Sequence, residues 1–136
     1  MAGGSATLPD GGREEGGRIL LRPDLLVRLE GFAALAFPVW WYAAHGGSWV
    51  IFAVLFLAPD IAMLGYLWGP RIGAAVYNLV HTYTTVGAVI ALGLVTDHRL
   101  LVYLGLILAA HIGFDRLLGF GLKYPSGFND THLQRL

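Results

Sequence analysis

Residues 49–68, WVIFAVLFLAPDIAMLGYLW, form an apolar stretch in which Asp60 is the one charged residue. A helix of about 20 apolar residues is long enough to cross a hydrocarbon core of roughly 30 Å. A charged side chain at the centre of such a helix costs roughly 2.5–3.5 kcal/mol on insertion scales. The stretch therefore predicts a membrane-spanning helix whose carboxylate faces the interior of the protein.

The composition of the whole chain agrees with this class. Of its 136 residues, 56% are hydrophobic and 13% are charged, and its mean hydropathy is +0.62, which is too apolar for an ordinary soluble domain. The absence of cysteine excludes disulfides, thiolate metal ligands and a cysteine nucleophile. A net charge of zero, with no cluster of basic residues, argues against nucleic acid as a partner.

Four apolar segments of membrane-spanning length follow one another in a domain covering residues 23–120. Turn and cap residues separate them; Gly69-Pro70, for example, ends one segment and starts the next. Short connections place consecutive helices antiparallel. We therefore expect an all-α integral membrane protein folded as a four-helix up-down bundle. The expected spans are about 25–44, 49–68, 72–95 and 99–118.

The basic residues predict the orientation of this bundle. Of the nine lysines and arginines, all but Arg99 fall on the side that carries both termini. The positive-inside rule then places both termini in the cytoplasm, in a multi-pass protein of the inner (plasma) membrane. The alternative is that the first segment, with Arg28 and Glu30, lies in the membrane interface and does not span.

The two ends of the chain differ in character. Residues 1–22 are rich in glycine and mixed charge and predict a flexible tail, and they lack the apolar region of a signal peptide. Residues 121–136 combine aromatic, glycine and polar residues around a turn at Pro125-Ser126-Gly127. We expect this C-terminal segment to fold back and pack at the cytoplasmic face.

Polar side chains in the four segments fall at similar depths. At 1.5 Å per helical residue, Asp60, His81 and His111 lie roughly 10–14 Å below the cytoplasmic surface. A second set lies shallower, at roughly 5–9 Å. The sequence thus predicts a polar funnel that opens toward the cytoplasm. The shallower set is Glu30, Asn78 and Asp115.

Asp60, His81 and His111 match the donor set of a divalent metal site, because neutral imidazoles and an ionised carboxylate are suitable ligands. Asp115 or Glu30 would then orient a ligand or act as a general base. Taken singly, each histidine is more often an interhelical hydrogen-bonding residue than a ligand. Two histidines on adjacent helices also leave open a haem held between them, although carboxylates are unusual neighbours for a haem.

A second set of residues suits an anionic group at the mouth of the funnel. Arg116 and Lys123 are expected to clamp a phosphate or carboxylate headgroup, and Arg71 can join them. The structural alternative is that Arg116 snorkels to the headgroups or pairs with Glu30. The full substrate-binding set that we expect is Asn78, Arg71, Arg116, Lys123 and His132.

Several short motifs stand out in residues 25–136. They are Leu29-Glu30-Gly31, Ala58-Pro59-Asp60, Gly69-Pro70-Arg71, Tyr77-Asn78-Leu79-Val80-His81, Ala110-His111-Ile112-Gly113-Phe114-Asp115-Arg116 and Leu122-Lys123-Tyr124-Pro125. With these motifs the chain resembles the small bacterial membrane proteins grouped as domain-of-unknown-function family 4260. The resemblance implies a compact bacterial membrane protein of unassigned activity, and it brings no known catalytic residues. Gln134 stands where we would expect a glycine.

Two classes of function remain open at this stage. The first is an intramembrane site for metal-assisted or acid–base chemistry on a lipid-like substrate. The second is a non-enzymatic membrane protein, either a small proton-coupled transporter or an accessory subunit. A transporter needs a polar path through the membrane. Because the extracellular half of the predicted bundle is almost wholly apolar, we rank transport below a site that opens on one side only. Membrane lipids are the expected partners, and small residues at four-residue spacing, such as Ala109 and Gly113, leave a homodimer open.

Overall fold

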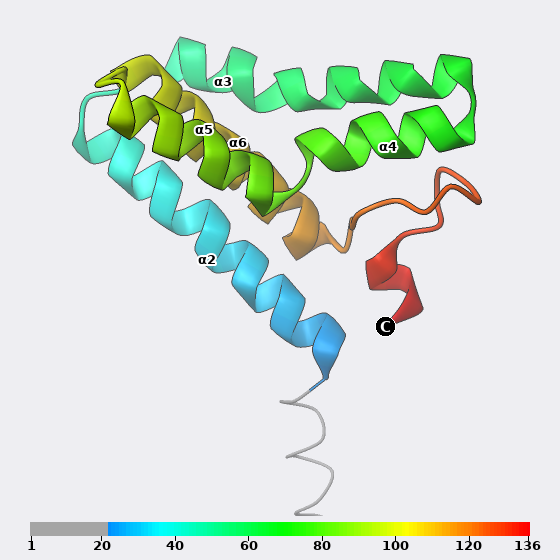
Figure 1. The fold of residues 1–136 in the computed structure, drawn as a ribbon. Coiled ribbons are helices and arrows are strands. Elements are labelled where there is room, and N and C mark those ends of the chain that lie inside the picture. Colours follow the sequence, from blue (N-terminus) through cyan, green and yellow to red (C-terminus); the bar gives the residue numbers. More distant parts are fainter. Residues whose placement is uncertain (1–21) are drawn as a thin grey trace, which may run out of the picture.

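The computed structural model describes residues 22–136, so the predicted N-terminal tail, apart from Arg22, lies outside the described residues. Within 22–136 the protein is helical and has no strand, which confirms the all-α prediction for this range. An isolated bridge joins Lys123 and Thr131. The elements in Figure 1 are α2 (Pro23–Ala44), α3 (Trp49–Leu57), η1 (Ala58–Trp68), α4 (Pro70–Val80), α5 (Tyr83–Val95), α6 (Arg99–Leu118) and η2 (His132–Arg135).

The predicted second span changes its helical form in the middle. It is α-helical as α3 up to Leu57 and continues as the 3-10 helix η1 from Ala58. Pro59 accounts for a change at this point, because proline has no N–H to donate to the carbonyl of Leu55. A 3-10 stretch inside a helix is often found at functional positions. Here it carries Asp60.

The predicted third span is two helices. α4 ends at Val80 and α5 begins at Tyr83, and the pair is bent by 44°. The Thr82 hydroxyl caps α5 by accepting a hydrogen bond from the Thr84 N–H at 3.4 Å. The break places His81 at the end of α4 instead of in the middle of a continuous helix.

The helices form two groups. α6 packs against α2 and α5, while α4 pairs with η1 in a hairpin that extends away from that bundle (Figure 1). The bundle contains a small core formed by Val86, Leu108, Ala109 and Ile112. α3 joins the two groups through its contacts with α6 and η1. The hairpin thereby carries Asp60 and His81 toward His111 in the C-terminal half of α6.

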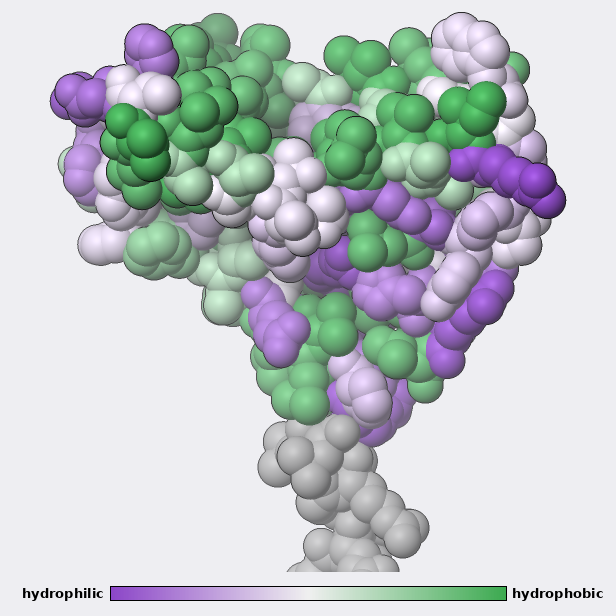
Figure 2. Space-filling view, in the orientation of Figure 1, coloured by the Kyte–Doolittle hydropathy of each residue, from purple (hydrophilic) through white to green (hydrophobic). Residues whose placement is uncertain are grey.

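Within the described residues, two helices are long and apolar enough to cross a membrane. They are Trp49–Trp68, which comprises α3 and η1, and Arg99–Leu118, and the bent pair of α4 and α5 is a third if it counts as one span. Only 11% of the apolar window in Trp49–Trp68 is buried within the protein. Figure 2 shows hydrophobic side chains over much of the two upper lobes of the molecule. This exposure is consistent with a membrane protein.

A close crossing of two glycines joins α2 and α6. A Cβ atom added at Gly113 would lie 2.6 Å from the Gly31 carbonyl oxygen, and one added at Gly31 would lie 2.8 Å from the Gly113 oxygen. Each clash would be with backbone, which cannot rotate away as a side chain can. The packing of α2 on α6 therefore requires a residue without a side chain at both positions.

We expect Gly113→Ala to lower stability by about 1–3 kcal/mol, since it overpacks a backbone contact. The measurement is thermal unfolding of the detergent-solubilised protein. Gly87→Ala in α5 is the matched control, because a Cβ there meets nothing within 4 Å. Equal melting temperatures for the two variants would show that the crossing is not tightly packed in solution.

Candidate metal centre and adjoining pockets

Three side chains from three elements converge on one point. Asp60 comes from η1, His81 from the end of α4, and His111 from α6. The two Nε2 atoms are 3.1 Å apart. Asp60 Oδ1 lies 3.5 Å from the Nε2 of His111 and 3.8 Å from that of His81. These three residues are a candidate metal site, and we refer to them as the metal centre.

The ring of His81 is held in a defined orientation. Its Nδ1 lies 2.9 Å from the Tyr77 carbonyl oxygen, which can only accept, so Nδ1 carries the proton and donates. The ring also stacks on Tyr77, with centroids 3.7 Å apart and planes 9° from parallel. Its Nε2 is therefore left with a lone pair directed at His111 and Asp60. This tautomer is the one required for Nε2 to bind a metal.

His111 is buried, and its exposed fraction is 2%. Its Nε2 can donate a hydrogen bond to the lone pair of His81 when no metal is bound. Its Nδ1 has no hydrogen-bond partner among the described residues. A buried polar atom without a partner costs roughly 1–3 kcal/mol. The hydrogen bonds of the described residues therefore do not account for the placement of this ring.

Asp115 adds a second carboxylate, one helical turn after His111. Its Oδ2 lies 3.5 Å from the Nε2 of His111 and 3.8 Å from that of His81. The Tyr77 hydroxyl donates to the same oxygen at 3.3 Å. Sequence reasoning missed Tyr77, although its position four residues before His81 places both on one face of a helix.

The distances suit a metal ion better than a network of hydrogen bonds alone. Two ligands bound at 2.0–2.1 Å to a tetrahedral metal lie about 3.3–3.4 Å apart. The nitrogen and oxygen atoms of the metal centre are 3.1–3.8 Å apart, and only the pair of nitrogens is in hydrogen-bonding range. The donor set of two imidazoles and a carboxylate fits Zn²⁺ and related divalent ions.

The same geometry argues against the haem alternative. A haem held by two histidines needs its iron and the porphyrin plane between the two ligand nitrogens. The 3.1 Å separation of the Nε2 atoms of His81 and His111 leaves no room for them. The two rings also meet edge to face, at 64°, and not across a flat slot.

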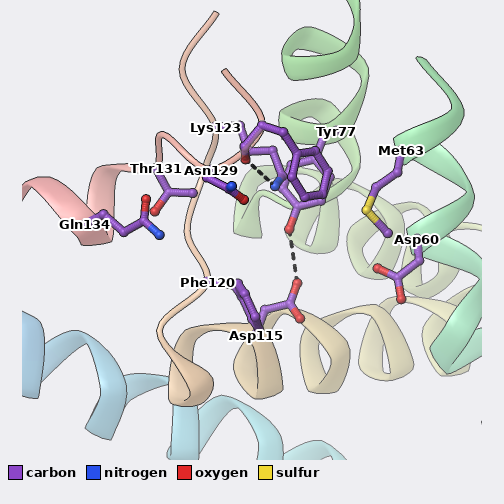
Figure 3. A pocket seen from close by; sticks show the side chains of 10 residues that line it. Asp60, Met63, Tyr77, Asp115, Phe120, Lys123, Asn129, Thr131 and Gln134 are labelled. Atoms are coloured by element: carbon purple, nitrogen blue, oxygen red, sulfur yellow. Dashed lines mark hydrogen bonds between the residues drawn. The ribbon is translucent and has the colours of Figure 1, made fainter. Parts of the chain in front are cut away.

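A cavity of about 310 Å³ adjoins the metal centre, and we call it the Lys123 pocket. Figure 3 shows Asp60 and Asp115 on one side of this pocket and Asn129, Thr131 and Gln134 of the C-terminal segment on another side. The wall also contains aromatic and thioether side chains, so the pocket is amphipathic. Its lining residues are Asp60, Met63, Tyr77, Asp115, Phe120, Lys123, Phe128, Asn129, Thr131 and Gln134.

Two polar side chains of this pocket are incompletely paired within residues 22–136: the Lys123 ammonium has no carboxylate beside it, and the Thr131 hydroxyl has no hydrogen bond. Lys123 is 7% exposed, and its ammonium donates to the Phe128 carbonyl at 2.8 Å and lies over the Phe128 ring, with no carboxylate within 4.0 Å among residues 22–136. Burial lowers the pKa of Lys123. The Thr131 hydroxyl is buried and has no hydrogen-bond partner in the described part of the chain. Both groups can serve an anionic ligand.

The C-terminal segment is held over the pocket by Asn78. The Asn78 side chain donates to the Lys123 carbonyl and accepts from the Lys123 N–H, each at 2.7 Å. Farther along, Arg135 donates to Asp130 at 2.8 Å, and hydrogen bonds from Arg135 and Ser126 lower the pKa of Asp130 to about 2. Asp130 therefore stays charged at neutral pH. The stability that its hydrogen bonds with Arg135 and Ser126 contribute is lost only as the pH falls below about 4 toward 2.

The remaining predicted site residues lie elsewhere. Glu30, Arg116 and His132 line a separate cavity of about 190 Å³, which shares no lining residue with the Lys123 pocket. Arg71 lines a third, open cavity beside Pro125. The expected clamp of Arg71, Arg116 and Lys123 is therefore divided among three cavities.

The fold and the His/Asp cluster together define a helical protein with candidate membrane spans and a candidate metal site. Residues 24–136 match the family described as Domain of unknown function (DUF4260), and the chain belongs to that family. This match confirms the resemblance seen in the sequence. No curated protein and no solved structure matches the chain.

We expect Asn78→Ala to release the C-terminal segment, because it removes both hydrogen bonds to the Lys123 backbone. The measurement is the rate at which a protease removes residues after Lys123 from the folded protein. Asn129→Ala is the control, since Asn129 is exposed and on the same segment. Equal cleavage rates for the wild type and both variants would contradict the role of Asn78.

Proposed function

We propose that this protein binds a divalent metal ion at Asp60, His81 and His111 and uses it in chemistry on a lipid-like substrate with an anionic group. The observation that carries the proposal is the pair of buried Nε2 atoms 3.1 Å apart, beside a carboxylate at 3.5 Å. Buried imidazoles with this convergence, next to a cavity, are typical of metal sites and not of structural pairs alone.

The Lys123 pocket supports the choice of substrate. Its apolar and aromatic walls suit an apolar body, and Lys123 with the Thr131 hydroxyl suits a phosphate or carboxylate group. Asp60 and Asp115 border the same cavity, so a ligand held by Lys123 lies beside the metal centre. The buried ammonium has no internal carboxylate among the described residues, which favours an anion from outside the protein.

Each residue near the metal centre has a distinct part in this proposal. A bound divalent ion would supply Lewis acidity at the inner end of the pocket. Asp115 is placed to accept a proton, because its Oδ2 faces the histidines and the cavity. Tyr77 orients both Asp115, through its hydroxyl, and His81, through its carbonyl. Lys123 binds the anionic group of the substrate and holds the substrate beside the metal centre.

We also propose that the chain spans the membrane four times with both termini in the cytoplasm. The basic residues and the antiparallel order of the helices support this topology. α2 is not among the helices that are long and apolar enough to span by composition. Its support as a span is its packing along α6, where Arg28 donates a hydrogen bond to the Leu117 carbonyl at 3.0 Å. On this topology the Lys123 pocket opens at the cytoplasmic side.

The metal proposal is tested by metal analysis of the purified, detergent-solubilised protein. We expect about one divalent ion per chain in the wild type and none in His81→Ala or His111→Ala, because each removes a ligand. His98→Ala is the matched control, since His98 is exposed and lies at the start of α6. If the wild type binds no Zn²⁺, Mn²⁺, Fe²⁺ or Co²⁺ on titration, and the alanine variants only lose stability, the histidines are structural.

We expect Tyr77→Phe to weaken metal binding by roughly tenfold, because it removes the hydroxyl that holds Asp115, the second carboxylate beside the two histidines. The backbone carbonyl that orients His81 and the ring that stacks on it both remain, so the fold should be kept. The measurement is a competitive metal titration, with the circular dichroism spectrum as a check on folding. Tyr103→Phe is the control, because the Tyr103 hydroxyl bonds to His45 far from the centre. Unchanged affinity would remove Tyr77 from the site.

A further inference from the structure

The second cavity, which we call the Arg116 pocket, lies between α2, α5, α6 and the C-terminal segment. It has a volume of about 190 Å³ and is lined by Val27, Glu30, Gly31, Tyr83, Arg116 and His132. It lies outside the proposed metal chemistry, because no residue of the metal centre borders it.

Arg116 is a buried cation with no anionic partner in the part of the chain from Arg22 onward. Its exposed fraction is 8%, and no carboxylate oxygen of the described residues lies within 4.0 Å of its guanidinium. Its hydrogen-bonding contacts in residues 22–136 are both to the ring of His132. A buried charge is strongly destabilising unless it is paired. The side chain lines a cavity, so the missing anion has a place to bind.

His132 adds a second donor at the same place. The Leu122 N–H donates to its Nδ1 at 2.8 Å, so in the neutral ring the proton is on Nε2. That Nε2 lies 2.6 Å from the Arg116 Nη1, which also carries protons. Burial and the charge of Arg116 lower the pKa of His132, which keeps the ring neutral at pH 7. In this tautomer the ring offers Arg116 no free acceptor, so both side chains are donors and an oxyanion in the cavity would supply the acceptor.

Glu30 faces the same cavity but does not touch Arg116. The two side chains line one pocket, and no ion pair joins them in the described structure. Glu30 is exposed, whereas Arg116 is buried. The pocket thus has a cationic inner end and an anionic rim. A ligand that carries a negative and a positive group would satisfy both ends at once.

We propose that the Arg116 pocket binds an aminophosphate headgroup of the phosphoethanolamine type, with its phosphate on Arg116 and His132 and its ammonium on Glu30. A phosphate has several strong acceptor oxygens and matches the guanidinium fork. A primary ammonium donates hydrogen bonds to a carboxylate, which a quaternary ammonium cannot do. The headgroup can belong to a membrane lipid or to a free aminophosphate, since both have the same chemistry.

The test measures the binding of short-chain phospholipids to the full-length protein in detergent, by thermal shift and by native mass spectrometry. The probes are dihexanoyl phosphatidylethanolamine, phosphatidylcholine and phosphatidylglycerol, together with free phosphoethanolamine. We expect phosphatidylethanolamine to bind roughly tenfold more tightly than the other two lipids, because only it makes a charge-assisted hydrogen bond to Glu30. Full competition by free phosphoethanolamine assigns the site to a soluble ligand, and its failure assigns the site to the lipid.

Two variants keep the proposal falsifiable. Arg116→Gln should abolish binding of all four probes. Because Arg116 is buried, this change can also destabilise the fold, so a second variant is needed. Glu30→Gln changes an exposed residue and should remove the preference for phosphatidylethanolamine while binding of phosphatidylglycerol remains. Asp97→Asn, an exposed acid at the other end of α6, is the matched control.

A wild type that binds phosphatidylethanolamine and phosphatidylglycerol equally would overturn the proposal. So would a Glu30→Gln variant that keeps the preference, or one that loses stability without any probe present, because that result would indicate an internal pair with Arg116. Bound metal is measured in the same samples. If no headgroup preference is found but metal is still bound, only the headgroup proposal fails. If the preference is found but no metal is bound, only the metal proposal fails.

Discussion

The need to find a partner for the Asp60 carboxylate inside an apolar helix governs much of this structure. A charge left in hydrocarbon is costly, and partners within the same helix are excluded because the residues around it are apolar. The nearest polar groups come from α4 and α6, as His81 and His111, at 3.8 and 3.5 Å from the carboxylate, so a proton or a metal ion between them would complete the pairing. The hairpin of η1 and α4 is joined to the bundle by the contact of His81 with His111 as well as by apolar packing.

The site depends on local departures from the regular α-helix. Pro59 begins the 3-10 helix that carries Asp60, and the break after His81 frees that ring from the middle of a helix. The N–H of His81 still bonds to the Tyr77 carbonyl, and its Nδ1 shares that carbonyl, so the break costs no backbone partner there. Regular helices would have offered fewer directions in which these side chains could point.

The family assignment, the helical class and the polar layer could be predicted from the sequence. Hydropathy and the 1.5 Å rise per residue are local properties, so the depth of each polar group in a helix follows from its distance along the chain. Equal depth predicted the meeting of Asp60, His81 and His111, which the structure brings together. Depth placed Asp115 in the shallower set, but its four-residue spacing from His111 put both side chains on one face of the helix, and the structure has them together.

Depth does not specify direction, and only the tertiary structure decided which cavity each charged side chain faces. Arg116 and Lys123 are close in sequence, yet they line different pockets, because the C-terminal segment turns back after α6. That turn is held by Asn78, 45 residues before Lys123 in the chain. Hydropathy and helical spacing carry no information on such a long-range hydrogen bond. The sequence by itself thus determined the helices and the layer of polar residues, whereas the long-range contacts divided that layer into a metal centre and two pockets.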